Sequence, residues 1–231
     1  MSKSSHKTLY IIHGWAYSVK PWAHTLKLLR QAGVDVHMLH VPGLTEPSNR
    51  IWTIEEYVDW ANQNIPDGAI ALGHSNGGRI LLNLCAKNPK KLKRLILLAS
   101  AGVYEPSKKR NLLRKLAKLA SPLKKLPLLR KVFHKLIGAS DYSRAPENMK
   151  RTLANMLDSD KSLDLSKITT QTAILWGKQD TVTPPRQAET LHAKLKNSTL
   201  DFHQNWLHAP YITDPDGLAK AILATLESEV K

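Results

Sequence analysis

Short apolar runs alternate with longer segments of helical periodicity along most of this chain, and that alternation constrains its fold more than any other feature. The β-branched and aromatic runs have the length of buried strands, and the segments between them repeat their apolar residues at helical spacing. Strands are predicted at 8–14, 34–43, 68–75 and 92–101. Since a helix between successive strands is the usual connection of parallel neighbours, the pattern predicts a mostly parallel sheet with helices on both faces.

The alternation is interrupted and then resumes toward the C-terminus. Strands are predicted at 171–177 and 198–206, with a helix at 184–197 between them and a closing helix from Pro215. Residues 104–167 contain no convincing strand, and their apolar residues recur at helical spacing. We interpret this stretch as a helical insertion between two strands of one sheet, which has about six strands in all.

The composition fits a single globular domain with one insertion. The chain has 231 residues, of which 42% are hydrophobic, and a single cysteine, Cys85, which rules out an intramolecular disulfide and a thiolate metal cluster. The N-terminal apolar run from Leu9 to Ile12 is too short for the core of a signal peptide, and no window approaches the roughly 18 apolar residues of a membrane span. We therefore expect a cytoplasmic protein.

Most of the net charge of +15 comes from one segment of the predicted insertion. Residues 106–140 hold eleven Lys or Arg and no acid, whereas the rest of the chain has 23 bases against 19 acids. One interpretation is a solvated outer face. The other is a cationic, amphipathic surface that recruits an acidic partner: an anionic membrane surface, an acyl carrier protein or a carboxylated substrate.

The sequence pI of about 9.9 is also a feature of many nucleic-acid-binding proteins, so this class has to be considered. No nucleic-acid-binding motif is recognisable, and the basic segment is interleaved with leucines rather than with aromatic residues that could stack on bases. We expect no nucleic-acid partner.

A glycine-rich turn carries the first candidate for chemistry. The stretch GHSNGG, residues 73–78, places Ser75 between a predicted strand and a predicted helix. Gly-x-Ser-x-Gly by itself is a weak signal, but ligands of an open parallel sheet bind beyond the carboxyl ends of the strands, where this serine lies. The tight turn would expose the hydroxyl, and the helix would direct amide donors toward negative charge. A serine nucleophile also needs a base and an orienting acid.

The sequence resembles the α/β-hydrolase family, in which the nucleophile, acid and histidine follow one another in that order. Asp180, in WGKQDTVTP, matches the family's acid loop W-G-x-x-D-x-x-x-P, and His208, in HAPYITDP, matches the segment H-x-P-x-x-x-x-P beyond the last strand. The resemblance covers residues 8–103 and 168–228. It implies the α/β-hydrolase fold and a catalytic triad of Ser75, His208 and Asp180.

The resemblance also implies an oxyanion hole and a reaction. IIHGWAYS matches the family's H-G-x loop, so the backbone amide of Trp15 is the expected first donor and that of Asn76 the second. Ser75 would attack an ester, lactone or thioester carbonyl, His208 would act as general base and then general acid, and water would cleave the acyl-enzyme. This chemistry requires no metal and no organic cofactor.

Several residues compete with these assignments. His203 lies inside the last predicted strand with Asp201, as expected of a structural residue, and Asp214 has the position of a carboxylate at a helix entry. His13 and His74 flank the site in sequence, where packing or a hydrogen bond to a loop is a simpler role than chemistry.

One loop departs from the family pattern. Relatives often carry an aspartate followed by Leu-Pro-Gly-x-Gly-x-Ser, whereas HVPGLTEPSNR has His40 at the first position and lacks the second glycine. That loop usually shapes the entrance, so we expect the departure to affect the substrate's shape and to leave the triad intact.

The resemblance divides the chain into a hydrolase core, residues 1–103 and 168–231, and a helical, basic cap, residues 104–167, that roofs the pocket. Two alternatives to a hydrolase stay open, since a fold does not establish an activity. One is a ligand-binding protein on the same scaffold, and the other is a lyase or perhydrolase that uses the same triad. Turnover of esters discriminates a hydrolase from the ligand-binding protein, for which turnover should be negligible on every ester.

Overall fold

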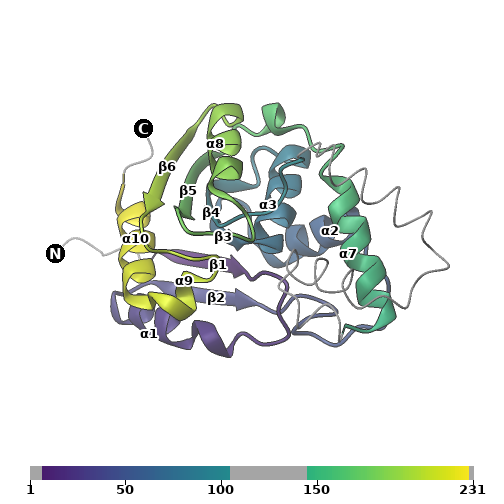
Figure 1. Cartoon of the computed structure of the whole chain (residues 1–231), viewed down its shortest axis with the longest axis horizontal. Coiled ribbons are helices and arrows are strands. Elements are labelled where there is room, and N and C mark those ends of the chain that lie inside the picture. The colour runs from purple at the N-terminus through teal and green to yellow at the C-terminus, as the bar shows by residue number, and fades with distance from the viewer. Residues whose placement is uncertain (1–6, 105–144, 229–231) are drawn as a thin grey trace.

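A computed structural model describes residues 7–104 and 145–228 of the chain and shows one six-stranded sheet between two layers of helices (Figure 1). The strand order is β2-β1-β3-β4-β5-β6, and every neighbouring pair is parallel. The strands are β1 (Thr8–Ile12), β2 (Asp35–Leu39), β3 (Ala69–His74), β4 (Leu92–Leu98), β5 (Gln171–Gly177) and β6 (Ser198–His203). The predicted parallel α/β sheet is confirmed.

The helices cover both faces of this sheet. The described helices are η1 (Lys20–Trp22), α1 (Ala23–Gln31), α2 (Ile54–Asn64), α3 (Asn76–Lys87), α7 (Glu147–Ser159), η3 (Leu165–Lys167), α8 (Pro185–Lys194), α9 (Pro210–Thr213) and α10 (Pro215–Glu227). Helices α1 and α10 pack on one face through Leu29 and Ile222, and α2, α3 and α8 pack on the other through Tyr57, Leu81 and Leu191. Each face thereby buries its own hydrophobic core.

Local sequence signals explain where elements begin and why some strands end early. Thr53 and Glu56 form a capping box at the start of α2, which satisfies backbone donors of the first turn. Four predicted strands, at 8–14, 34–43, 92–101 and 198–206, are longer than the corresponding β1, β2, β4 and β6. The chain leaves β4 at Ala99, whose φ of +44° is incompatible with extended backbone.

The predicted insertion is described only in part. Residues 105–144, which include the whole basic segment, lie outside the described residues. Within 145–167 the structure shows α7 and η3, and α7 is attached to the loop before α2, because Thr152 Oγ1 accepts from the Trp52 amide at 2.9 Å and Asn155 donates to the Trp52 carbonyl at 3.1 Å. The division into core and cap stays a prediction.

No helix in residues 7–104 and 145–228 combines the length and the apolar character needed to cross a membrane.

Arg94 on β4 ties the end of the last helix to the sheet. Its guanidinium is buried, donates to the carbonyls of Thr225 and Ser228, the latter at 2.7 Å, and donates to Gln171 Oε1 at 3.1 Å. The last carbonyls of a helix have no intrahelical donor, and a cation at that end also complements the helix dipole.

We therefore predict that Arg94→Met lowers the free energy of unfolding by about 1–3 kcal/mol, since buried acceptors lose a charged donor. Urea denaturation measures the change. Lys93→Met is the matched control, because Lys93 is exposed on the same strand, and it should change stability by less than about 0.5 kcal/mol. Equal effects of the two substitutions would contradict this role of Arg94.

Candidate active site

Ser75 occupies a sharp turn between β3 and α3 at the carboxyl edge of the sheet. Its backbone has φ +51° and ψ −118°, a conformation that costs a non-glycine residue about 1–3 kcal/mol. Two hydrogen bonds hold it there: the Ser75 amide donates to the Leu98 carbonyl at 3.1 Å, and the Ala101 amide donates to the Ser75 carbonyl at 2.9 Å. The turn thus depends on the neighbouring strand β4 and the chain that follows it.

Close backbone approach explains the glycines after the serine. A Cβ atom at Gly77 would lie 2.0 Å from the carbonyl oxygen of Ile12, and one at Gly78 would lie 2.0 Å from Ser100 Oγ. A side chain at Gly77 would push α3 away from the end of β1, and one at Gly78 would push it away from Ser100, which follows β4. The glycine-rich stretch therefore lets the helix start directly against the strand ends.

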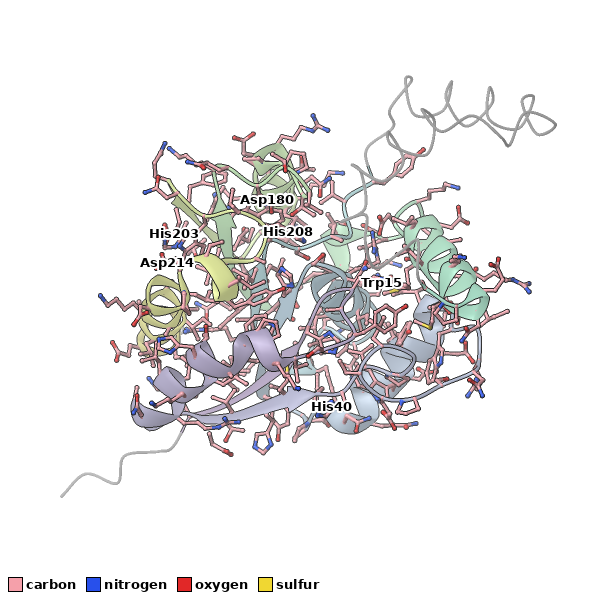
Figure 2. All side chains as sticks on the ribbon, turned by 60° about the horizontal axis from the view of Figure 1, so that its bottom comes forward. Trp15, His40, Asp180, His203, His208 and Asp214 are labelled. Atoms are coloured by element: carbon pink, nitrogen blue, oxygen red, sulfur yellow. The ribbon has the colours of Figure 1, made fainter. Side chains whose placement is uncertain are left out.

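The structure brings Ser75, His208 and Asp180 together in one chain of hydrogen bonds. Ser75 Oγ lies 3.1 Å from His208 Nε2, and His208 Nδ1 lies 2.9 Å from Asp180 Oδ2. The ionised carboxylate only accepts, so Nδ1 carries the proton and Nε2 is the acceptor for the serine hydroxyl. Figure 2 shows Asp180 and His208 side by side, although 28 residues separate them.

Asp180 is buried in a shell of donors that keep it ionised. Its Oδ1 accepts from the amides of Val182 at 2.8 Å and Thr183 at 2.9 Å, and its Oδ2 lies 2.7 Å from Thr183 Oγ1. Burial alone would raise the pKa of Asp180, but the hydrogen bond and charge of His208, together with the Thr183 hydroxyl and amide, outweigh burial and hold that pKa below its usual range.

Thr183 is a site residue that the sequence reasoning missed. Its buried hydroxyl also lies 3.1 Å from His208 Nδ1 and 3.1 Å from the Ala99 carbonyl. A signal was present: a threonine three residues after an aspartate in a turn often bonds back to it. The partners His208 and Ala99 come from distant segments and have no such signal.

His74, beside the nucleophile, contacts the loop of His208. Its Nε2 donates to the His208 carbonyl at 2.9 Å, and its buried ring lies against Trp22, Tyr211 and the His208 ring. Burial lowers the pKa of His74 to about 3, so the imidazole is neutral. The structure thus shows the hydrogen bond to a loop that was the simpler expectation for this residue.

The expected oxyanion donors lie beside the serine. Asn76 is the first residue of α3, so its amide has no acceptor within the helix. A Cβ at Gly14 would lie 3.0 Å from Ser75 Cβ, which places the Gly14–Trp15 peptide along the serine. Within the described part of the chain, the Trp15 amide has no hydrogen-bond acceptor. Both amides are available to a ligand.

The competing residues have other partners. His203 is the last residue of β6, where its ring stacks on Trp206 at 3.5 Å and its Nε2 lies 3.2 Å from Asp201 Oδ2. Asp214 caps α10 by accepting from the Gly217 amide at 3.0 Å and accepts from Trp206 Nε1 at 2.7 Å. Figure 2 shows His203 and Asp214 apart from the His208–Asp180 pair.

The described residues were also compared with the ligand sets that hold metal ions in proteins. Among those residues, no group of three or more His, Cys, Asp or Glu side chains is arranged to hold a metal ion.

The donors around Asp180 generate a prediction about acid stability. A carboxylate whose folded-state pKa is lowered stabilises the fold above its unfolded pKa of about 3.9, and that contribution disappears as the pH falls through the folded-state pKa. Thr183→Val should cost about 1–3 kcal/mol at pH 7, because it removes a donor to a buried charge. The difference from the unmodified protein should shrink below about pH 4.

Urea denaturation at pH 7 and at pH 3 measures this difference, and Thr183→Ser, which keeps the hydroxyl, is the control. A penalty for Thr183→Val that is independent of pH would show that the hydroxyl does not act through the Asp180 carboxylate.

Comparison with known proteins identifies the family of this chain. The family model described as alpha/beta hydrolase fold matches residues 7–122 of the sequence. The chain is 27% identical over 234 residues to a pimeloyl-[acyl-carrier protein] methyl ester esterase of Neisseria meningitidis serogroup A, covering 92% of this chain and 74% of that protein. It is 23% identical over 243 residues to the esterase of the same name from Salmonella newport, covering 96% and 94%.

A solved structure agrees with the fold. MGS-MChE2, an alpha/beta hydrolase enzyme from the metagenome of lagoon sediments of Mar Chica, Morocco, superposes with a TM-score of 0.70 at 20% identity, covering 96% of this chain and 91% of that one. Sheet order, turn geometry and the family match agree with one another. This chain therefore belongs to the alpha/beta hydrolase fold family.

Proposed function

We propose that this protein is a serine hydrolase of carboxylic esters. The observation that carries the proposal is the unbroken chain of hydrogen bonds from Ser75 through His208 to Asp180 at the carboxyl edge of the sheet. The esterases among the relatives support the same reaction class. In this proposal Ser75 is the nucleophile, His208 the base and Asp180 the orienting acid.

The geometry suits acyl transfer in two steps. His208 Nε2 takes the proton of Ser75 as the hydroxyl oxygen attacks the carbonyl carbon, and the amides of Trp15 and Asn76 hold the resulting oxyanion. The protonated His208 then gives its proton to the leaving alcohol as the C–O bond breaks. In the second step His208 activates a water molecule, which attacks the acyl-enzyme and releases the acid and Ser75.

The carboxylate of Asp180 has two roles in this mechanism. Its hydrogen bond to Nδ1 keeps a proton on that nitrogen, so Nε2 of the neutral imidazole faces the serine with a lone pair before each step. Its negative charge stabilises the imidazolium that forms in each step. The donors of Val182 and Thr183 keep the carboxylate ionised and aligned.

We propose further that the substrate is an acyl ester carried on an acidic carrier protein. The relatives named above are esterases of pimeloyl-[acyl-carrier protein] methyl ester. The eleven bases and no acids of residues 106–140 would attract an acidic carrier by long-range electrostatics. Lactones, thioesters and free esters are the alternatives, and a panel of these compounds separates them.

Substitution of the triad tests the reaction class. Ser75→Ala should lower kcat for a p-nitrophenyl ester by about 10⁴-fold to 10⁶-fold, because the nucleophile is lost, and Asp180→Asn should lower it by about 10⁴-fold, because the imidazole tautomer is no longer held. Thermal unfolding checks that both variants fold. Near-normal turnover by either variant would refute the assignment.

The histidines offer a matched pair of variants. His208→Gln should lose activity to the same degree as Ser75→Ala, while His203→Gln should retain it, because His203 packs on Trp206 away from the serine. Both variants are measured with the same p-nitrophenyl ester. In the unmodified protein a fluorophosphonate probe should label Ser75, and peptide mass spectrometry identifies the labelled residue. Absence of turnover on every ester tried would favour the ligand-binding alternative.

Salt dependence tests the carrier proposal. The ratio of kcat/KM for a carrier-linked methyl ester to that for the free methyl ester should be above one at low salt and should fall as salt is added. Replacing Lys108, Lys109 and Arg110 by Gln should lower this ratio. Replacing the exposed Lys194, Lys196 and Lys220, which lie on and beside α8 and on α10, should not. If the ratio of the two kcat/KM values changes neither with salt nor on replacement of Lys108, Lys109 and Arg110, the carrier proposal is refuted.

A further inference from the structure

Resting on the proposed function, we infer that Thr45 and His13 are positioning residues that orient and polarise the Gly14–Trp15 peptide, whose N–H is the proposed oxyanion donor. Neither side chain would touch the substrate. Both would act on the transition state through one peptide bond, and Thr45 lies in the loop whose sequence departs from the family pattern.

The contacts form a continuous path that ends at this peptide. The amide of Val41 donates to Thr45 Oγ1 at 3.0 Å, Thr45 Oγ1 lies 2.8 Å from His13 Nε2, and His13 Nδ1 lies 2.7 Å from the Gly14 carbonyl oxygen. His13 is 2% exposed, so water does not compete for its ring.

The direction of every hydrogen bond in the path follows from the chemistry of its ends. The Gly14 carbonyl can only accept, so His13 Nδ1 carries the proton. In a neutral imidazole Nε2 then has only a lone pair, so the Thr45 hydroxyl must donate to it. Burial lowers the pKa of His13 to about 4, which keeps the ring neutral near pH 7. The lone pair of Thr45 Oγ1 accepts from Val41.

The path has two effects on the proposed donor. In a trans peptide the C=O and N–H bonds point in opposite directions, so a carbonyl held by His13 fixes the Trp15 N–H on the other side of the peptide plane. A carbonyl that accepts a hydrogen bond also makes its own N–H a stronger donor, since chains of hydrogen bonds polarise one another. Preorganised donors of this kind stabilise the oxyanion without reorganisation.

Thr45 is the residue that distinguishes this chain. It occupies the place of the second glycine in the family's Leu-Pro-Gly-x-Gly-x-Ser pattern, which here reads VPGLTEPS. A glycine has no hydroxyl to donate, so His13 Nε2 would lack this partner. The turn that carries Thr45 is itself held by the Thr45 and Glu46 amides, which both donate to the Val41 carbonyl at 3.1 Å.

Removal of the Thr45 hydroxyl tests the inference. Thr45→Val should lower kcat on an ester by about tenfold to a hundredfold, less than the 10²-fold to 10³-fold that loss of an oxyanion donor costs, and should leave KM nearly unchanged. Affinity for a boronic acid that forms a tetrahedral adduct with Ser75 should fall by the same factor as kcat. A purely structural role would lower stability without this parallel loss.

Two further variants serve as controls for the expected effect of Thr45→Val. Thr45→Ser keeps the hydroxyl and should restore both kcat and boronate affinity. Thr25→Val is the matched control, because the buried Thr25 hydroxyl has no hydrogen-bond partner among the residues that the structure describes, so its loss should alter neither value. Normal kcat and boronate affinity in a folded Thr45→Val protein would overturn the inference.

A readout on the unmodified protein is independent of activity. Long-range ¹⁵N NMR, with the His13 signals assigned from a His13→Asn spectrum, should show His13 as the Nδ1–H tautomer at pH 7. An Nε2–H tautomer would overturn the inference even if the enzyme is active. Conversely, an Nδ1–H tautomer in a protein that turns over no ester and binds no boronate would refute the proposed function while leaving the hydrogen-bond path intact.

Discussion

The contact between the first turn of α3 and the end of β1 is the constraint on which the rest of the site depends. Gly77 lies so close to the Ile12 carbonyl that no side chain fits, and this closeness keeps the strained Ser75 beside the Gly14–Trp15 peptide, the proposed oxyanion donor. The strain is offset by hydrogen bonds to Leu98 and Ala101 and by the buried layers on both faces of the sheet. The rigid sheet thereby holds the strained backbone in place and presents the half-buried Ser75 hydroxyl to His208.

Around this turn, hydrogen bonds from buried groups hold three segments in place. Asp180 is held by two amides and a hydroxyl, the backbone of His208 is held by His74, and the Gly14–Trp15 peptide is held by His13. In a low-dielectric interior such networks stabilise strongly when they are satisfied and cost as much when they are broken. The loops that carry the proposed catalytic groups are therefore fixed in place before a substrate arrives.

Much of the fold and of the candidate site could be predicted from the sequence. The strands at β3 and β5 matched closely, because their apolar runs end at His74–Ser75 and at Gly177, where the chain must turn. The predicted strands at β1, β2, β4 and β6 were too long, because the sequence pattern does not show where tertiary contacts bend the chain. The bonds of Thr183 to His208 and Ala99 had no signal in the sequence, since these partners come from distant segments. For His74 the sequence indicated a bond to a loop but not which loop.

The order of strands and helices and the glycines of the tight turn could be derived from the sequence, because they follow from local periodicity and turn chemistry. The roles of Ser75, Asp180 and His208 came from the resemblance to a family. The folded structure was needed to show which polar atoms meet: the Ser75–His208–Asp180 chain, the donors on Asp180, and the path from Thr45 through His13 to Gly14. A hydrogen bond depends on a few tenths of an ångström and on direction, and those are set by the packing of the sheet and its two helical layers.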